Sequence, residues 1–503
     1  MATSRSDGGP GVTGTPTFGP GGPGAASSGP GVVVAPFDVA VIGAGPAGLA
    51  AAAAASASGV RVALVDAGPR PGGQYWRHRS GDDGARHHGW PAYLALRTAL
   101  TAAETAGTLV RFERHAVWHV ERDEAGVTIH ALVNGAGREV RARMLVIATG
   151  AYDRQLPFPG WTLPGVFTAG AAQAMLKGQG VLVGRRIAVS GTGPFLLPVA
   201  AALVEAGATV VGVFEAGRPT AFAKHPLTVL RARAKLVEGA GYLRTLWRHR
   251  VPYRMRSAVI AALGEDEVRG VRVARLDAAW CVIPGSERTI DCDTVAVGYG
   301  FTPSTEIAVQ VGAGMIPDRD GSLVATVDEA QRSSVPGVFV AGEACGVGGA
   351  ELALVEGELA GLHAAAAAGG ATPDPARVRR LGGRRAHGRA FAAALHEAYP
   401  VRSGWGAWLA PDTIVCRCEE VPVSAIHEAV DELGAEDPRA AKLFARPGMG
   451  LCQGRVCGYA TACVVAARRG REVTPADLAG TSARPIAQPV SMSVLAAEPG
   501  GDA

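Results

Sequence analysis

Two close pairs of cysteines lie near the C-terminal end of the 503-residue sequence. Cys416 and Cys418 are one residue apart in IVCRCEEV, and Cys452 and Cys457 are four residues apart in GMGLCQGRVCG. Eight cysteines in a chain of this length do not form a disulfide framework, and their crowding indicates metal or redox use in a reducing compartment. We therefore predict that these four thiolates form one ligand set.

The segment between the two pairs predicts a small all-α module. An amphipathic helix at about 423–433 and a second short helix would bring the four thiolates to one point. Thiolates suit zinc or an iron–sulfur cluster, and geometry by itself does not choose between them. The single-residue gap of the first pair is less usual for structural zinc, and nearby glycines leave backbone N–H groups free to approach bridging sulfides. These glycines are Gly448, Gly450, Gly454 and Gly458.

A glycine-rich turn near the N-terminal end predicts a dinucleotide site. Residues 37–68 read as a strand, a turn with Gly43, Gly45 and Gly48, an Ala-rich helix and a second strand that ends at Asp66. The glycines permit a tight turn, close approach of a pyrophosphate and close helix packing, and the helix N-terminus at Pro46 and Ala47 faces the diphosphate. Asp66 is placed to accept hydrogen bonds from ribose hydroxyls.

Three further segments extend this predicted site. A Gly-Gly-Gln stretch would let the main chain lie against a flat ring, a buried strand ends in Thr-Gly, and a late strand ends in Gly-Glu before a Gly-rich turn and an apolar helix. The predicted contacts in these segments are Gly73, Gln74, Thr149, Gly150, Gly342 and Glu343.

A second strand–turn–helix–strand unit occupies residues 185–217. Gly191 and Gly193 form its turn, and Glu215 ends its second strand. Leu196 stands where the third glycine of the fingerprint is expected, so pyrophosphate binding is less assured. Glu215 would accept from a ribose 2′-hydroxyl and repel a 2′-phosphate. The unit therefore predicts either an NADH site or a structural domain that has lost its ligand.

Residues 36–372, approximately, resemble the two-dinucleotide-domain flavoproteins of the glutathione reductase and ferredoxin reductase type. The resemblance rests on the first unit, the Ala-Thr-Gly strand and the late Gly-Glu pair, which occur in this order. The resemblance implies that the first unit binds FAD, that the second holds NAD(P)H, and that the Gly-Glu pair binds the ribitol, with Glu343 in place of the usual Asp. Disulfide reductases of this type carry a redox cysteine pair beside the flavin. The sequence has none in those regions, since Cys281, Cys292 and Cys345 stand apart.

The cysteine quartet resembles the bacterioferritin-associated-ferredoxin-like [2Fe–2S] domain over about 412–470. Cys463 falls outside the pattern and is expected to be a core residue. A flavoprotein fused to this domain resembles the α subunits of hetero-oligomeric amino-acid dehydrogenases: the A subunit of opine oxidase, the B subunit of hydrogen cyanide synthase, and the proline and hydroxyproline dehydrogenase α subunits. The resemblance implies a partner flavoprotein of the glycine/D-amino-acid oxidase type, which oxidises the C–N bond of an opine, proline, hydroxyproline, glycine or sarcosine-like substrate, and often a small ferredoxin-like subunit.

These features predict an α/β fold with two Rossmann-type domains and a small all-α domain. The expected divisions are a disordered Gly/Pro-rich tail at 1–35, an FAD domain at 36–155 and 290–372, a second dinucleotide domain at 156–289, a linker at 373–410, the cluster domain at 411–480 and a tail at 481–503.

Composition excludes several other classes. The net charge is only +4 with four lysines, which argues against nucleic acid as a partner. The longest apolar run, about 187–214, is broken by glycine and proline, so no membrane span is expected, and a cytoplasmic protein is predicted, with membrane association only through electron-transfer partners. The histidine-containing stretch 77–90 is expected to be a solvated loop, and the basic stretch 220–256 to form one amphipathic helix.

Two alternatives to the dehydrogenase subunit remain open on the sequence. A stand-alone NADH-dependent ferredoxin-type reductase would use Gly191, Gly193 and Glu215 productively. A non-catalytic electron-transfer or assembly subunit would hold the same cofactors without reducing them itself.

Overall fold

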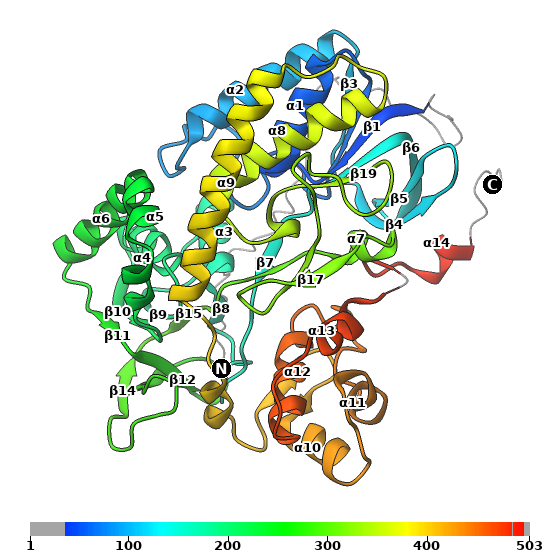
Figure 1. Ribbon diagram of the computed structural model, residues 1–503. Coiled ribbons are helices and arrows are strands. Elements are labelled where there is room, and N and C mark those ends of the chain that lie inside the picture. The colour runs from blue at the N-terminus through cyan, green and yellow to red at the C-terminus, as the bar shows by residue number, and fades with distance from the viewer. Residues whose placement is uncertain (1–35, 485, 497–503) are drawn as a thin grey trace, which may run out of the picture.

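The computed structural model describes residues 36–484 and 486–496. Two sheet-based domains lie side by side, a long helix runs along both of them, and a small helical module lies below (Figure 1). The expected tail at 1–35, and residues 485 and 497–503 of the expected tail at 481–503, lie outside the described residues.

The first domain is built on a seven-stranded sheet in the order β3-β2-β1-β6-β5-β4, with β19 also paired to β6. β1 is parallel to β2 and β6, and β19 is parallel to β6, so the carboxyl ends of these strands meet at one edge. Its strands are β1 (Phe37–Ile42), β2 (Val62–Val65), β3 (Leu109–Phe112), β4 (Ala116–Arg122), β5 (Val127–Val133), β6 (Ala136–Ile147) and β19 (Val338–Val340).

Small residues let the helices of this domain pack closely. α1 (Pro46–Ala57) lies against α8 (Ala350–Ala367), and a Cβ at Gly357 or Gly361 of α8 would collide with the α1 backbone at Ala47 or Ala51. α2 (Trp90–Thr105) packs on the other side of α1. The Ala-rich composition of α1 therefore serves close backbone packing.

The second domain has a five-stranded sheet in the order β11-β10-β9-β15-β8. Its strands are β8 (Val166–Thr168), β9 (Arg186–Gly191), β10 (Thr209–Glu215), β11 (Tyr253–Met255) and β15 (Thr294–Gly298), with helices α3 (Ala169–Gln179) and α4 (Leu196–Glu205). A three-stranded antiparallel sheet of β12 (Ser257–Leu263), β13 (Gly270–Arg275) and β14 (Arg288–Asp291) is attached to it.

The return to the first domain comes later than the predicted boundary at 290. β15 pairs with β8 and β9 and so belongs to the second sheet. The crossing is made by two antiparallel strands, β7 (Ala151–Asp153) and β16 (Phe301–Pro303), which connect the domains. After them come α7 (Glu306–Gln310), the β17 (Met315–Pro317) and β18 (Leu323–Ala325) hairpin, and the 3₁₀ turn η2 (Gly342–Cys345).

The predicted linker at 373–410 is instead an ordered part of the fold. Most of it is the 24-residue helix α9 (Pro375–Ala398), capped by Asp374 and followed by η3 (Ser403–Trp408). α9 contacts α8 of the first domain and η1 (Pro219–Lys224) of the second. Its contact with α8 combines ion pairs with a small apolar cluster around Leu381.

Two other expectations also differ from the structure. The stretch 220–256 is not one helix but η1, α5 (Pro226–Arg231), α6 (Arg233–Arg248) and strand β11, with a break at Ala232 between the two α-helices. In the stretch 77–90, the side chain of His87 is buried and its ring stacks on Trp90, with centroids 4.8 Å apart. That segment is therefore packed by aromatic contacts.

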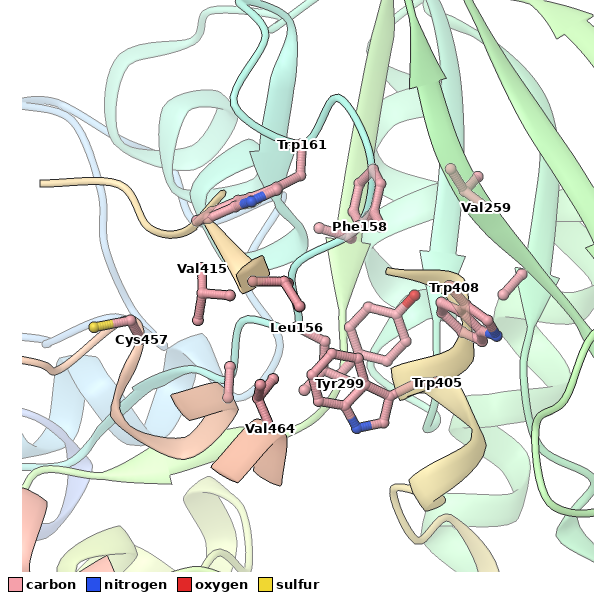
Figure 2. Close-up of a cluster of buried hydrophobic side chains, with 14 of the residues drawn as sticks. Leu156, Phe158, Trp161, Val259, Tyr299, Trp405, Trp408, Val415, Cys457 and Val464 are labelled. Carbon is pink, nitrogen blue, oxygen red and sulfur yellow. The ribbon is translucent and has the colours of Figure 1, made fainter. Parts of the chain in front are cut away.

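The C-terminal module contains a short hairpin and four helices. These are β20 (Ile414–Cys416), β21 (Val421–Pro422), α10 (Val423–Asp431), α11 (Pro438–Ala445), α12 (Gly458–Arg468) and α13 (Pro475–Ser482). Its core is continuous with that of the second domain: Figure 2 shows Val415 and Val464 in one apolar cluster with Leu156, Phe158 and Trp161. The expected helix at 423–433 corresponds to α10.

The expected C-terminal tail is partly structured. α13 continues to Ser482, and α14 (Met492–Ala496) follows near the end of the described residues. Between them, Ala487 is buried and its N–H donates to the carbonyl of Trp118 on β4 at 2.6 Å. The segment after the module thus packs back on the first domain.

Candidate cofactor sites

The β1–α1 turn has the shape that a bound diphosphate requires. Gly43 has φ +105°, and a Cβ there would strike the carbonyl oxygen of Ala148. A Cβ at Gly48 would strike the carbonyl oxygen of Gly43. Gly45, in contrast, has an open face whose nearest atom is the Cα of Gly73 at 4.0 Å, and α1 begins there without a side-chain cap. Free helix N–H groups therefore point to an open, positively polarised site.

Asp66 lies at this turn but already holds the protein backbone. Its Oδ2 accepts from the N–H of Ala44 at 2.6 Å, and its Oδ1 accepts from the N–H of Gly68 at 2.6 Å. The carboxylate keeps further lone pairs, so its predicted ribose contact stays a prediction. In this structure the Asp66 carboxylate fixes the loop that follows β1.

The other predicted contacts of the first site gather around the same turn. The N–H of Gly72 donates to the carbonyl of Ala44 at 2.7 Å, which seats Gly73 against Gly45 and leaves Gln74 exposed. At the end of β6, Thr149 Oγ1 donates to the carbonyl of Ser304 at 2.6 Å. Gly150 has φ +75° and open space beside it.

The Gly-Glu pair completes the edge of this sheet. Glu343 Oε1 accepts from the N–H of Gly349 at 2.9 Å, directly before α8. Burial raises the pKa of Glu343 to about 7, against the opposing effect of the Gly349 and Gly348 N–H groups. This carboxyl group therefore titrates near neutral pH.

Sequence reasoning missed the ionic support behind Gly342. Its N–H donates at 3.1 Å to Glu356 Oε2 on α8, a carboxylate with a fully buried side chain. Arg389 on α9 pairs with both oxygens of Glu356, at 2.7 and 2.8 Å, and also donates to the carbonyl of Gly346. The arginine-rich composition of the predicted linker at 373–410 was the sequence feature that could have indicated these ion pairs.

The second glycine turn is closed by its own acidic residue. Glu215 is fully buried; its Oε2 accepts from the N–H of Gly193 at 2.9 Å, and its Oε1 accepts from Thr192 Oγ1 at 2.7 Å. Burial raises its pKa, which these donors partly offset. In a nucleotide-binding turn such a carboxylate would meet the ribose. Here Glu215 accepts from Gly193 and Gly217, while the carbonyl of Gly191 accepts from the N–H of Ala216.

The four predicted cysteine ligands converge in the C-terminal module. Cys416 neighbours Cys457, and Cys418 neighbours Cys452. Each member of the first pair thus lies beside one member of the second. The neighbouring Cys457 thiol, with smaller contributions from backbone N–H groups and against the effect of burial, lowers the pKa of Cys416 to about 5. Cys463 lies apart from this set, beside Tyr459 at the edge of the shared apolar core.

Of the four glycines expected near the sulfur atoms, Gly448 and Gly450 lie beside the cysteines, whereas the N–H of Gly458 donates to the carbonyl of Gly454. The N–H of Gly448 points to Cys416 Sγ at 3.3 Å, and a Cβ at Gly450 would collide with the Cβ of Cys418. Within the described residues, no three of the cysteine sulfurs lie within 4.8 Å of one another as one mononuclear ligand group. The thiols are instead arranged as two contacting pairs.

No helix in the described part of the chain combines the length and apolarity that crossing a membrane would require.

Comparisons with known proteins agree with the two-domain architecture. Residues 37–369 match the family model described as pyridine nucleotide-disulphide oxidoreductase. The A subunit of opine oxidase from Agrobacterium tumefaciens is 37% identical over 92% of this chain and 91% of that protein. The HcnB subunit of hydrogen cyanide synthase from Pseudomonas protegens is 33% identical over 83% of this chain and 90% of that protein.

A solved structure extends the fold match through most of the chain. The crystal structure of L-proline dehydrogenase from P. horikoshii aligns with a TM-score of 0.67 at 21% identity and covers 92% of this chain and 80% of that one. At this identity the match concerns the fold.

Proposed function

Because the chain belongs to the pyridine nucleotide-disulphide oxidoreductase family, we propose that it is the FAD-carrying subunit of a hetero-oligomeric enzyme that oxidises an amino or imino compound. Its relatives from opine oxidase and hydrogen cyanide synthase are themselves subunits of those enzymes, which supports such an assembly. The partner would be a second flavoprotein that carries out C–N oxidation, joined in some assemblies by a small ferredoxin-like subunit.

The residues of the first turn fit the flavin dinucleotide. The open face of Gly45 and the uncapped N-terminus of α1 suit the diphosphate, and Gly150 lies at the same sheet edge without a side chain that would fill the space. FAD bound there would accept an electron pair and release electrons singly. The protein's part is to orient the ring and to set its potential through groups such as Glu343.

The C-terminal thiols fit a [2Fe–2S] cluster better than one zinc ion. Four sulfurs in two contacting pairs can serve two irons, whereas tetrahedral zinc needs all four around one point. The Gly448 N–H aimed at Cys416 is the kind of neighbour that tunes cluster potential. Cys416, Cys418, Cys452 and Cys457 would hold the cluster.

One observation favours an electron-relay subunit over an NADH-dependent reductase. The Glu215 carboxylate, which an NADH site would use, is fully buried and accepts from the N–H of Gly193. Asp66 at the first turn also accepts from backbone N–H groups, but its side chain is only half-buried. The second domain then serves as a structural platform for the thiol module, whose core it shares. Electrons would therefore enter from a partner subunit.

The test is reduction of the bound flavin by candidate donors. The full chain is mixed anaerobically with NADH, then with amino and imino acids, before and after co-expression with a glycine-oxidase-like flavoprotein. We expect flavin bleaching by an amino or imino acid in the complex, and none by NADH in the isolated chain. Rapid bleaching of the isolated chain by NADH would contradict the proposal.

A further inference from the structure

A buried ionic contact joins the cysteine module to the first domain. Glu306, the first residue of α7, accepts at Oε1 from Arg455 Nε at 2.9 Å and from Arg484 at 2.8 Å. Glu306 is 7% exposed, and the side chains of Arg455 and Arg484 are 21% and 9% exposed. Two guanidinium groups thus converge on one carboxylate between modules.

Arg455 lies inside the loop that carries two of the predicted ligands. It stands between Cys452 and Cys457, and both its backbone N–H and its guanidinium donate to the carbonyl of Cys452, at 3.2 and 3.4 Å. A shift of this arginine would therefore move the backbone of the ligand loop. No other basic residue lies between these two cysteines.

The other end of the contact leads to the predicted flavin edge. Glu306 follows Ser304 by two residues, and the N–H of Ser304 donates to the carbonyl of Gly150 at 2.9 Å. The carbonyl of Ser304 accepts from Thr149. A short, hydrogen-bonded stretch of backbone therefore connects the end of β6 to the carboxylate that holds the ligand loop.

The opposite side of the module is attached to the second domain by different forces. The indole N–H of Trp161 donates to the carbonyl of Ile414 at 2.6 Å, and Val415 lies in the shared apolar core beside Trp161 and Leu156 (Figure 2). Apolar burial supplies cohesion but little directional precision. The contact with the first domain is ionic, with two guanidinium groups on one carboxylate.

We propose that Arg455 is a positioning residue: through Glu306, it fixes the cysteine ligand loop against the flavin edge of the first domain and so sets the distance for one-electron transfer between the two cofactors. This rests on the proposed function for the identity of the cofactors. With both cofactors bound, the step would be the transfer of one electron from the reduced flavin to the oxidised cluster. Arg484 restrains the same carboxylate from the segment after α13.

A purely stabilising ion pair is the alternative. Buried pairs often add little net stability, because desolvation offsets attraction, but they restrict geometry when both partners are fixed. Arg455 and Glu306 lie on short segments held by further hydrogen bonds on each side. A positioning role therefore predicts a loss of electron transfer that exceeds any loss of stability.

The experiment measures cluster reduction after flash photoreduction of the flavin in the full-length holoprotein. The variants are R455M, E306Q, the double variant, and R455K. R468M serves as the control, because Arg468 pairs with Asp431 within the module at its exposed surface. Iron and sulfide content and the cluster EPR spectrum are recorded for each. Hydrogen exchange of residues 302–310 and 450–458 reports the contact itself.

We expect R455M and E306Q each to slow cluster reduction about tenfold or more, because each loses the charge-assisted bond that holds the ligand loop in place. The double variant should resemble the singles, R455K should be intermediate, and R468M should match the wild type. Exchange should rise in both segments together in R455M and E306Q. E306Q leaves the ligand loop unchanged, so it tests the contact even where R455M loses its cluster.

Unchanged cluster reduction and unchanged exchange in E306Q would overturn the proposal. Wild-type protein without iron and sulfide would instead refute the proposed function. In that case coupled exchange of the two segments would still measure the ionic contact, so the two failures are distinguishable.

Discussion

The backbone N–H of Gly193 donates to Glu215 Oε2 at 2.9 Å, so the second glycine turn is closed by the carboxylate that a nucleotide would need. We predict that NADH neither binds nor reduces the isolated holoprotein. Stopped-flow absorbance and calorimetry measure this, with dithionite as the control that the flavin is reducible. A dissociation constant for NADH in the micromolar range would contradict this account of Glu215.

Gly45 offers a test of the flavin cradle that leaves the fold intact. Its φ of −76° suits alanine, and a Cβ there meets no protein atom closer than 4.0 Å, but it would occupy the space that the pyrophosphate needs. We expect Gly45→Ala to weaken FAD binding at least about tenfold, or 1.4 kcal/mol, with an unchanged melting temperature of the flavin-free protein. Flavin fluorescence titration measures the affinity.

The matched control for Gly45→Ala is Gly382→Ala. Gly382 lies in helix α9 with open space around it, so alanine there should leave FAD affinity unchanged and slightly stabilise the helix. Equal flavin affinity in both variants would show that the diphosphate does not approach Gly45.

Arg389 should matter for stability because its partner is buried. Removal of the guanidinium in Arg389→Met leaves Glu356, whose side chain is fully buried, without its bidentate partner, which costs about 3–5 kcal/mol of unfolding free energy. It also loosens the acceptor of the Gly342 N–H, so FAD should be released more readily. Denaturant unfolding and flavin retention on dialysis measure the two effects.

The exposed pair of Arg377 with Glu358 provides the comparison on the same helix. Their side chains are 41% and 26% exposed, so Arg377→Met should cost less than about 1 kcal/mol. If Arg389→Met cost no more than this, the assignment of α9 as a support of the flavin edge would be wrong.

The raised pKa of Glu343 should make the stability of the flavin-free protein depend on pH. Because burial raises its pKa from 4.5 to about 7, the folded state binds more protons than the unfolded state between these values. Its contribution to stability is therefore fully present below about pH 4.5 and is lost as the pH rises through about 7. Wild type should lose stability relative to Glu343→Gln across this window, as measured by denaturant unfolding at several pH values.

The charged neighbours of Glu343 act on this titration in opposite directions, since Arg389 lowers its pKa and Glu356 raises it. In an Arg389→Met background, the stability difference between Glu343 and Glu343→Gln should therefore have its midpoint at a higher pH. Parallel pH profiles for wild type and Glu343→Gln would show that this carboxyl group has an ordinary pKa.

Local patterns with strong steric demands were predictable from the sequence. The turn at Gly43, Gly45 and Gly48 needs residues without side chains, and the cysteine pairs needed only the helices between them to meet. In both places the residue types and their spacing reveal the chemical constraint, and the structure brings the expected residues together.

Features that depend on distant partners were not predictable. The sequence left open whether Glu215 meets a ribose, because its position after a strand does not reveal that Thr192 and Gly193 donate to it. The segment of helix α9 was predicted as a linker from its Pro/Arg/Ala-rich composition. That composition does not reveal the ion pair of Arg389 with the buried Glu356 or the packing of Leu381 on α8. The domain return was placed at 290 because the pairing of β15 with the second sheet is a long-range choice.

Cys416 and Cys463 provide a paired test of the thiol site. Cys416 neighbours Cys457 in the ligand set, whereas Cys463 lies beside Tyr459 away from it. Cys416→Ser should lose the cluster and its EPR signal, and Cys463→Ser should keep both. Loss of iron in the two variants alike would indicate general destabilisation of the module instead of ligation.

The most direct test of the central claim is anaerobic purification of the full chain, followed by assays of flavin, iron and acid-labile sulfide and by EPR of the photoreduced protein. The account predicts FAD with about two irons and two sulfides per chain, and a reduced-cluster signal that appears after the flavin is reduced. Bound zinc without sulfide, or a flavin whose reduction produces no cluster signal, would contradict it.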